Sequence, residues 1–199
     1  WSPRDEEEMV PVETMVEQFR LEDVSRSPAF FDEQKLQHFN AHYIRELGED
    51  EFTALAAEWV EPHVERFDAG VFAQVAPLAQ TRVRLLSELA PTVAFLFTDD
   101  VDIEEASWEK AVAKNEWSAD VLREAAAAFA DCAWDAETLK DTTLAIGERH
   151  GVKLGKAQAP IRVAVTGRTV GLPLFESLEA LGRERTLPRL ERALARAGA

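Results

Sequence analysis

The chain has 199 residues, of which 46% are hydrophobic and 30% are charged, and its formal net charge is −15. This composition is typical of a soluble globular protein, and the length suits one to three small helical units around a real core. No apolar stretch approaches the ~18 residues of a membrane span, and no signal peptide is visible, so we expect a cytoplasmic protein without membrane contact. Because the first residue is Trp1 and not Met, we expect a piece of a longer protein.

The charge is unevenly distributed along the chain. Residues 149–199 hold ten Lys or Arg and four Glu, a net charge of +6, whereas the remainder carries −21. A strongly acidic protein is at first a poor candidate for binding nucleic acid. Because salt screens charges beyond ~8 Å at physiological ionic strength, a local basic patch can still attract phosphate. The distribution therefore suggests, without specificity, a nucleic-acid contact at the C-terminal end.

Helical patterns dominate the whole chain. Strand signals are weak, since Ala, Leu, Glu and Arg prevail over alternating Val, Ile and Thr. Asp32 is predicted to cap a helix over 33–47 that Gly48 ends, and Gly151 is predicted to end a helix over 138–150. Further predicted helices cover 11–19, 50–64, 77–97 and 121–134, and a final helix opens near Pro188. We therefore predict an all-α fold.

The segment KLGKAQAPIRVAVTGRTVGLP, residues 153–173, differs from its surroundings because it contains several glycines and prolines and almost no acidic residue. We predict a helix-joining loop there, with IRVAV as a short buried helix and not a strand. Arg162 and Arg168 have no local carboxylate partner in this segment. Such a guanidinium suits a phosphate or a base edge, as where proteins read the unstacked bases of RNA loops.

The final helix carries a regular row of arginines, Arg185, Arg189, Arg192 and Arg196. Spacings of four, three and four residues place them on one narrow stripe of a helix, opposite leucines that can pack. The stripe has two interpretations that the spacing alone does not separate. One is a solvated basic face that favours the C-terminal end of the helix dipole, and the other is contact with phosphate.

The chain is poor in features of enzyme chemistry. It has no nucleophile elbow, Walker loop or CxxC pair. His38 and His42 have a zinc-compatible spacing, but without an HExxH pattern or a third ligand we expect a surface or packing role. The lone Cys132 is expected to be a small buried hydrophobe. The tryptophans of helical segments are expected in the core: Trp59, Trp108, Trp117 and Trp134.

Two long motifs carry a resemblance to a known family. The first is WSPRDEE with FRLEDVSRSPAFFDEQKLQHFNAHYIREL, and its matching residues are Ser27, Ala29, Phe31, Asp32, Lys35, Leu36, Asn40, Tyr43, Ile44 and Arg45. The second is GVKLGKAQAPIRVAVTGRTVGLPLFESLEALGRERTLPRLERAL near the end. Both resemble the C-terminal half of bacterial glutamyl-tRNA synthetases. The resemblance implies an all-α half-molecule: a stem-contact region at about 1–48, then two helical anticodon-binding units at about 49–104 and 105–199.

The resemblance also implies roles for particular residues. Arg82 falls where discriminating members read the third anticodon base, with Arg84 as its close alternative. Arg162 and Leu174 fall where the family contacts the first two anticodon bases, and Gly171 falls where some members have a threonine. Residues implied to contact the tRNA stem or backbone are Lys35, Asn40, Arg45, Arg168, Arg185 and Arg189, of which Asn40 can equally be a packing residue.

The implied partners are glutamate tRNA and the protein's own N-terminal catalytic domain, and the expected state is a monomer. The family's catalytic fold, which uses ATP and Mg, has no counterpart in this sequence, so we expect no cofactor here and no activity of this chain alone. Two rival functions remain: a free-standing helical protein-interaction module, and a different tRNA-binding accessory factor. The first rival, a protein-interaction module, would not need a loop that contains arginines and no acidic residue. An upstream reading frame with a HIGH motif would separate the synthetase from both.

Overall fold

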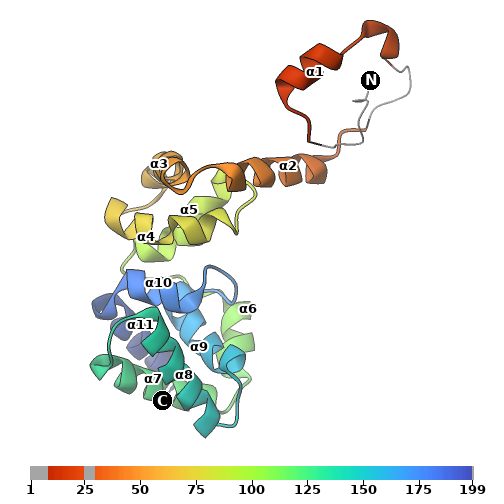
Figure 1. The fold of residues 1–199 in the computed structure, drawn as a ribbon. Coiled ribbons are helices and arrows are strands. Elements are labelled where there is room, and N and C mark those ends of the chain that lie inside the picture. Colours follow the sequence, from red (N-terminus) through yellow and green to blue (C-terminus); the bar gives the residue numbers. More distant parts are fainter. Residues whose placement is uncertain (1–8, 25–29, 199) are drawn as a thin grey trace.

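The computed structural model describes residues 9–24 and 30–198 of the chain, and every regular element in those ranges is helical. The all-α prediction is thereby confirmed. The motif WSPRDEE at 1–7 and the motif residues Ser27 and Ala29 lie outside the described residues. Figure 1 shows an elongated molecule, with α1 (Val12–Gln18) at one end and α2 (Glu33–Glu46) leading from it to the remaining helices. None of the helices in these ranges combines the length and the apolar character that a membrane span requires.

Helix α2 begins and ends where the sequence predicts. Asp32 Oδ1 accepts hydrogen bonds from the backbone N–H groups of Gln34 and Lys35, both at 3.0 Å, which satisfies donors that the first helical turn leaves unpaired. The apolar side chains of α2 are only partly buried, because Ile44 lies in the core while Leu36 and Tyr43 are about half exposed. Only the C-terminal part of α2 therefore packs against the rest of the molecule.

A first group of helices follows α2. It comprises α3 (Glu49–Val60), α4 (Ala69–Gln80) and α5 (Leu89–Val93), with 3-10 turns at Glu61–His63, Leu86–Glu88 and Ala94–Leu96. The buried Gln80 links it to α2, since its Nε2 donates to the carbonyls of Ile44 at 2.8 Å and Leu47 at 2.9 Å. These bonds use carbonyls that the end of α2 leaves without a helical partner.

The prediction of one continuous helix over 77–97 is wrong. Pro77 lies inside α4, and the chain leaves the helix after Gln80 and turns at 81–85 before α5. Leu85 is extended, and the Glu88 carboxylate accepts from the N–H groups of Arg84 at 2.6 Å and Leu85 at 3.3 Å. The Glu88 side chain thus replaces the helical partners of these two donors. The apolar periodicity across 77–97 therefore comes from two separate helices, α4 and α5.

A second group holds the C-terminal helices, shown in green to dark blue in Figure 1. They are α6 (Glu105–Trp108), a π-helical segment (Glu109–Ala113), α7 (Ser118–Asp131), α8 (Ala136–Arg149), α9 (Leu154–Thr166), α10 (Leu174–Leu181) and α11 (Arg183–Ala197). Asp135 caps α8 through the N–H of Thr138 at 2.8 Å. Gly151, with φ +66°, ends α8 as predicted, because glycine adopts this conformation without steric cost.

Two other sequence expectations change in this second group, and one changes in the first group. The predicted loop over 153–173 is helical for most of its length, because α9 runs from Leu154 to Thr166 and only 167–173 is a loop. The expectation of a buried helix at IRVAV is correct. The final helix starts at Arg183, with Pro188 inside it. Trp59 is 45% exposed, whereas Trp108 is buried, so the core expectation holds for Trp108 and fails for Trp59.

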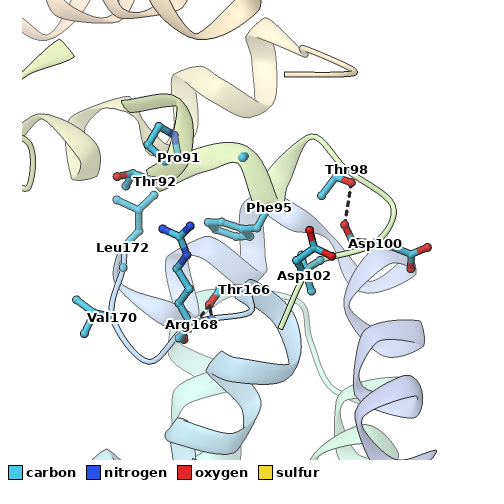
Figure 2. A pocket seen from close by; sticks show the side chains of 13 residues that line it. Pro91, Thr92, Phe95, Thr98, Asp100, Asp102, Thr166, Arg168, Val170 and Leu172 are labelled. Atoms are coloured by element: carbon cyan, nitrogen blue, oxygen red, sulfur yellow. Dashed lines mark hydrogen bonds between the residues drawn. The ribbon is translucent and has the colours of Figure 1, made fainter. Parts of the chain in front are cut away.

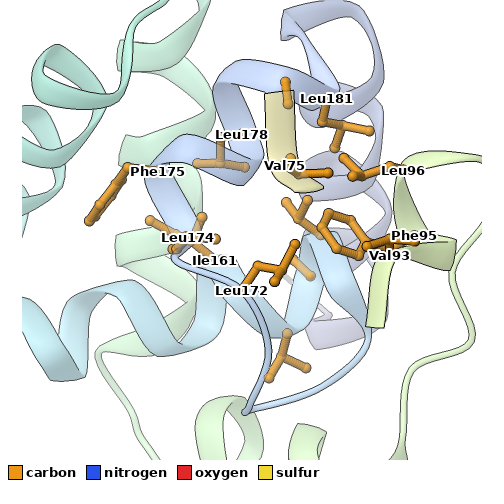
Figure 3. Packing of buried hydrophobic residues seen from close by; sticks show 14 of the residues in the cluster. Val75, Val93, Phe95, Leu96, Ile161, Leu172, Leu174, Phe175, Leu178 and Leu181 are labelled. Carbon is orange, nitrogen blue, oxygen red and sulfur yellow. The ribbon is translucent and has the colours of Figure 1, made fainter. Parts of the chain in front are cut away.

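The two groups share one hydrophobic core. Figure 3 shows Val75 of α4 and Leu96 beside Leu178 and Leu181 of α10, and all four side chains belong to one buried cluster. Such continuous packing holds neighbouring units in a preferred orientation. The division into units at 49–104 and 105–199 stays a prediction, since the cluster extends on both sides of that boundary.

Candidate nucleic-acid interface

The turn after α4 presents two arginines from a firmly held backbone. Val83 is 2% exposed and anchors the turn in the core, so its neighbours Arg82 and Arg84 project outward. The Asn40 side-chain amide donates to the Arg84 carbonyl and ties the turn to α2. Among the described residues, the Arg82 guanidinium has neither a hydrogen-bond nor an ion-pair partner. A charged group on a fixed backbone is therefore left for an external acceptor.

Arg162 lies near Arg82 but belongs to α9, so the expectation that it sits in a loop is wrong. Its guanidinium is half-buried, and Nη1 donates to the Leu172 carbonyl at 2.6 Å. Burial, and then the positive charge of Arg82, lower the pKa of Arg162, while Glu176 acts in the opposite direction. Two guanidinium groups from opposite sides of the junction are therefore close enough to repel each other, an arrangement that an anionic ligand would stabilise.

Beside these arginines lies a hollow of about 290 Å³ between the two groups of helices. One wall is the segment 91–102 and the other is the loop after α9, including Arg168, Gly171 and Leu172. In Figure 2 the Arg168 side chain points across the hollow towards Phe95 and Leu172. Its guanidinium has no partner among the described residues. The lining thus combines the Arg168 guanidinium, an aromatic ring and hydroxyl groups, which can contact unstacked bases. It also holds the carboxylates of Asp102 and of Asp100, and Asp100 is paired with Arg192.

The loop after α9 is anchored to the opposite wall through its backbone. Gly167 has φ +78°, and a Cβ built on it would lie 2.2 Å from the Asp102 carbonyl oxygen. The N–H of Glu104 donates to the Gly167 carbonyl at 3.0 Å, and the N–H of Thr169 donates to Ser107 Oγ at 3.2 Å. The position of Arg168 therefore depends on a close backbone approach that only glycine permits.

The remaining predicted site residues lie elsewhere or are already engaged. Lys35 and Arg45 are exposed on α2, where Lys35 lies over the Phe39 ring with 5.6 Å between Nζ and the ring centroid. The Asn40 amide is used in packing, the alternative that the sequence left open. Leu174 is 2% exposed and packs in the shared core, so its side chain offers no contact area to a ligand. Gly171 lines the hollow.

The arginine stripe of α11 is exposed only in its second half, which corrects both interpretations for Arg185 and Arg189. Arg189 is 1% exposed and donates to three backbone carbonyls, and Arg185 donates to the carbonyls of Leu96 and Leu181. Arg192 forms an ion pair with Asp100, and Arg196 pairs with Glu105 and lies over the Trp108 ring. The stripe faces the segment 95–105, so Arg185 and Arg189 are structural here.

The histidines of α2 and the lone Cys132 do not form a reactive site in the described part of the chain. His42 Nε2 lies 3.1 Å from the Glu46 carboxylate on the same helix, and the described residues contain no cluster of three or more side chains suited to hold a metal ion. Burial raises the pKa of the Cys132 thiol, while the charge of Arg183 lowers it. A thiol with a raised pKa holds less thiolate at neutral pH, which disfavours a nucleophilic role.

The wall at 91–102 is the part of the site that the sequence analysis missed. Phe95 and Thr92 were covered by the wrong prediction of a continuous helix over 77–97. An indication was present in the sequence: Pro91 is typical of the first turn of a helix, and it lies in the first turn of α5, so it marks a second helix within 77–97.

Comparison with known proteins decides the family. The model of the family described as "Anticodon binding domain" matches residues 51–194, well over half of the chain. The chain belongs to this anticodon-binding domain family. Its sequence is 52% identical over 198 residues to a glutamate–tRNA ligase of Frankia alni, an alignment that covers 97% of this chain and 42% of that protein. A glutamate–tRNA ligase of Frankia casuarinae is 54% identical over 201 residues, again with 97% and 42% covered.

The fold of the chain also resembles that of a solved glutamate tRNA ligase. A crystal structure of a glutamate tRNA ligase from Elizabethkingia meningosepticum, in complex with its amino acid, superposes with a TM-score of 0.83 at 22% identity and covers 98% of this chain and 38% of that one. At this identity the likeness concerns the fold alone. The chain spans about two fifths of the length of the curated relatives it matches. The predicted resemblance to the C-terminal half of these ligases is thereby confirmed.

Proposed function

We propose that this chain binds the anticodon loop of glutamate tRNA, as the anticodon-recognition part of a glutamate–tRNA ligase. The observation that carries the proposal is the pair Arg82 and Arg162, which interact electrostatically beside a hollow that Arg168 lines. Arg162 is tied to this hollow through its bond to the carbonyl of Leu172, a lining residue. These arginines belong to a chain whose net charge is −15, so RNA docked elsewhere is repelled while phosphate is attracted locally to them.

The geometry supports distinct roles for these residues. Arg82 has no partner in the described part of the chain and can donate two parallel hydrogen bonds to a base edge, the arrangement that discriminates between bases. Arg162 has Nη1 engaged with the Leu172 carbonyl, which holds the guanidinium in place beside Arg82. Because the Leu174 side chain is buried, we assign it a contact through its backbone N–H at the start of α10. Gly171 leaves room beside Arg168 for a base.

Other parts of the proposal extend beyond this site. Lys35 and Arg45, exposed on α2, are proposed to contact the tRNA backbone nearer the stem. The protein's own catalytic domain is the proposed neighbour in the full-length ligase, and ATP and Mg would act there and not on this chain. We also propose that the protein works as a monomer in the cytoplasm.

Arg162→Ala tests whether this arginine contacts RNA. We expect the affinity for a glutamate tRNA transcript to fall by about 1–3 kcal/mol, because a charge-assisted contact is lost, while the midpoint of thermal unfolding changes little. Filter binding and a thermal melt measure the two quantities. The matched control is Arg123→Ala on α7, whose guanidinium forms a surface ion pair with Asp120. Should the melting midpoint of Arg162→Ala fall as much as its affinity, the bond to Leu172 is the main role of Arg162.

The 199-residue chain is expected to show no ATP–pyrophosphate exchange and no aminoacylation. The reason is chemical, since the sequence contains neither a phosphate-binding loop nor an activated nucleophile. Exchange of labelled pyrophosphate into ATP, with and without glutamate tRNA, measures it. Exchange activity that copurifies with the chain would contradict the assignment of catalysis to another part of the ligase.

A further inference from the structure

Arg189 is a buried cation that the site described above does not use directly. Its side chain is 1% exposed. Nη1 donates to the Val165 carbonyl at 2.7 Å, and Nη2 donates to the carbonyls of Phe95 at 2.8 Å and Thr98 at 2.5 Å. Burial, followed by the charges of Arg185 and Arg192, lowers the pKa of Arg189 to about 10, against the opposing effect of Asp100 and Asp99. Desolvating a guanidinium is costly, so these bonds must offset a large penalty.

The acceptors of Arg189 belong to the two walls of the hollow. Phe95 and Thr98 line the wall at 91–102. Val165 is the residue before Thr166, which lines the hollow and lies two positions before Arg168. The Arg189 guanidinium therefore bonds to the backbone of both walls at once.

The chemistry of arginine suits this task better than that of lysine. A planar guanidinium directs donors along two edges in a fixed geometry, whereas an ammonium is a compact point charge on a flexible stem. The carbonyls of Phe95 and Thr98 lie where the 3-10 turn Ala94–Leu96 ends, and groups at helical ends lack partners within the helix. Arg189 supplies donors to this end and ties it to α9.

We infer that Arg189 is a positioning residue, which sets the separation of the two walls and thereby places Arg168 opposite Phe95 for the incoming anticodon loop. The inference rests on the proposed function for its consequence in RNA binding. Its structural part, the fixed separation of the walls, stands independently of any ligand. The inference predicts that a side chain at position 189 that bonds to only one wall widens the range of wall separations without unfolding the protein.

The matched control comes from the same helix. Arg183 is half-buried, donates to the Cys132 carbonyl and lies over the Trp134 ring, with 5.3 Å between Cζ and the ring centroid. Like Arg189, it has a buried Nε without a hydrogen-bond partner among the described residues. Its contacts stay within the second helix group. Arg183→Met therefore removes a comparable arginine without touching either wall of the hollow.

The first measurement is a distance between the helix groups. Spin labels at Glu58 of α3 and Lys140 of α8, both exposed, are introduced into the chain carrying Cys132→Ser. We expect Arg189→Lys and Arg189→Met to broaden the distance distribution, and Arg183→Met to leave it as narrow as in the parent. Where Arg189→Met does not fold, Arg189→Lys decides, because it keeps the charge and one set of donors. A distribution that Arg189→Lys leaves unchanged overturns the inference.

The second measurement is binding of a glutamate tRNA transcript. We expect Arg189→Lys to weaken binding roughly tenfold or more, since a displaced Arg168 loses its contact, whereas Arg183→Met binds like the parent. Equal losses in both variants, in proportion to their melting midpoints, would show a general structural role and overturn the inference. If the parent chain itself binds no tRNA, the proposed function fails, and the spin-label distances alone decide whether Arg189 holds the walls.

Discussion

Replacing Gly167 by alanine should lower the free energy of unfolding by about 3 kcal/mol or more. Two effects add, because φ is +78° and the new Cβ would meet the Asp102 carbonyl oxygen at 2.2 Å. The left-handed conformation alone costs a non-glycine residue ~1–2 kcal/mol, and the clash forces the backbone of 102–103 away. For a chain of this size we expect the melting midpoint to fall by roughly 6–12 °C.

A matched control for Gly167→Ala is Gly155→Ala in the first turn of α9. Nothing lies within 4 Å of a Cβ built on Gly155. Alanine there should leave the free energy of unfolding unchanged or raise it by up to about 1 kcal/mol, because it lowers the conformational entropy of the unfolded chain. Calorimetry of both variants tests the pair. A Gly167→Ala protein as stable as the parent would show that the segment 102–104 yields easily, and that it does not fix the loop bearing Arg168.

The other large effect is expected on specificity. Arg82→Gln should narrow the difference in binding free energy between the natural glutamate tRNA and one with guanine as third anticodon base, by roughly 1–3 kcal/mol. The cytosine at that position offers acceptor atoms that a guanidinium can meet, and guanine presents a different edge and a larger ring. Overall affinity should change less, because phosphate contacts supply most of it.

Arg84→Gln is the matched control for Arg82→Gln. The two residues flank the buried Val83 on the same turn, and both are exposed. Binding of the two transcripts to both variants, each at a fixed salt concentration, separates the possible roles. Uniformly weaker binding of both tRNAs by Arg82→Gln would assign Arg82 to phosphate. A narrowed difference in Arg84→Gln and not in Arg82→Gln would transfer the role of base reader to Arg84.

The resemblance and the folded site contribute different parts of these predictions. The carry-over from the family places Arg82 and Arg162 at the anticodon, although they are 80 residues apart in sequence. Their proximity becomes visible only in the fold, through the effect of the Arg82 charge on the pKa of Arg162. Arg168 was assigned to the RNA backbone from sequence, and the structure places its side chain in the hollow near Phe95.

The sequence by itself determined the features that depend on local chemistry. The Asp32 side chain caps the start of α2, and Gly151 ends α8, as the sequence predicts. Both features depend only on a side-chain acceptor or on glycine geometry within a few residues of the helix end. The all-α class follows from helical periodicity, and the family follows from long motifs. These signals need no knowledge of distant partners.

Only the tertiary structure decided the features that depend on distant partners. The helical pattern over 77–97 breaks because Glu88 and Asn40 hold the turn at 81–85. The arginine spacing of α11 is equally compatible with solvent, phosphate or burial. Arg189 is buried because carbonyls 24 and more than 90 residues away in sequence accept its donors. A periodic pattern shows which residues share a face, but what that face meets is determined by the packing of the whole chain.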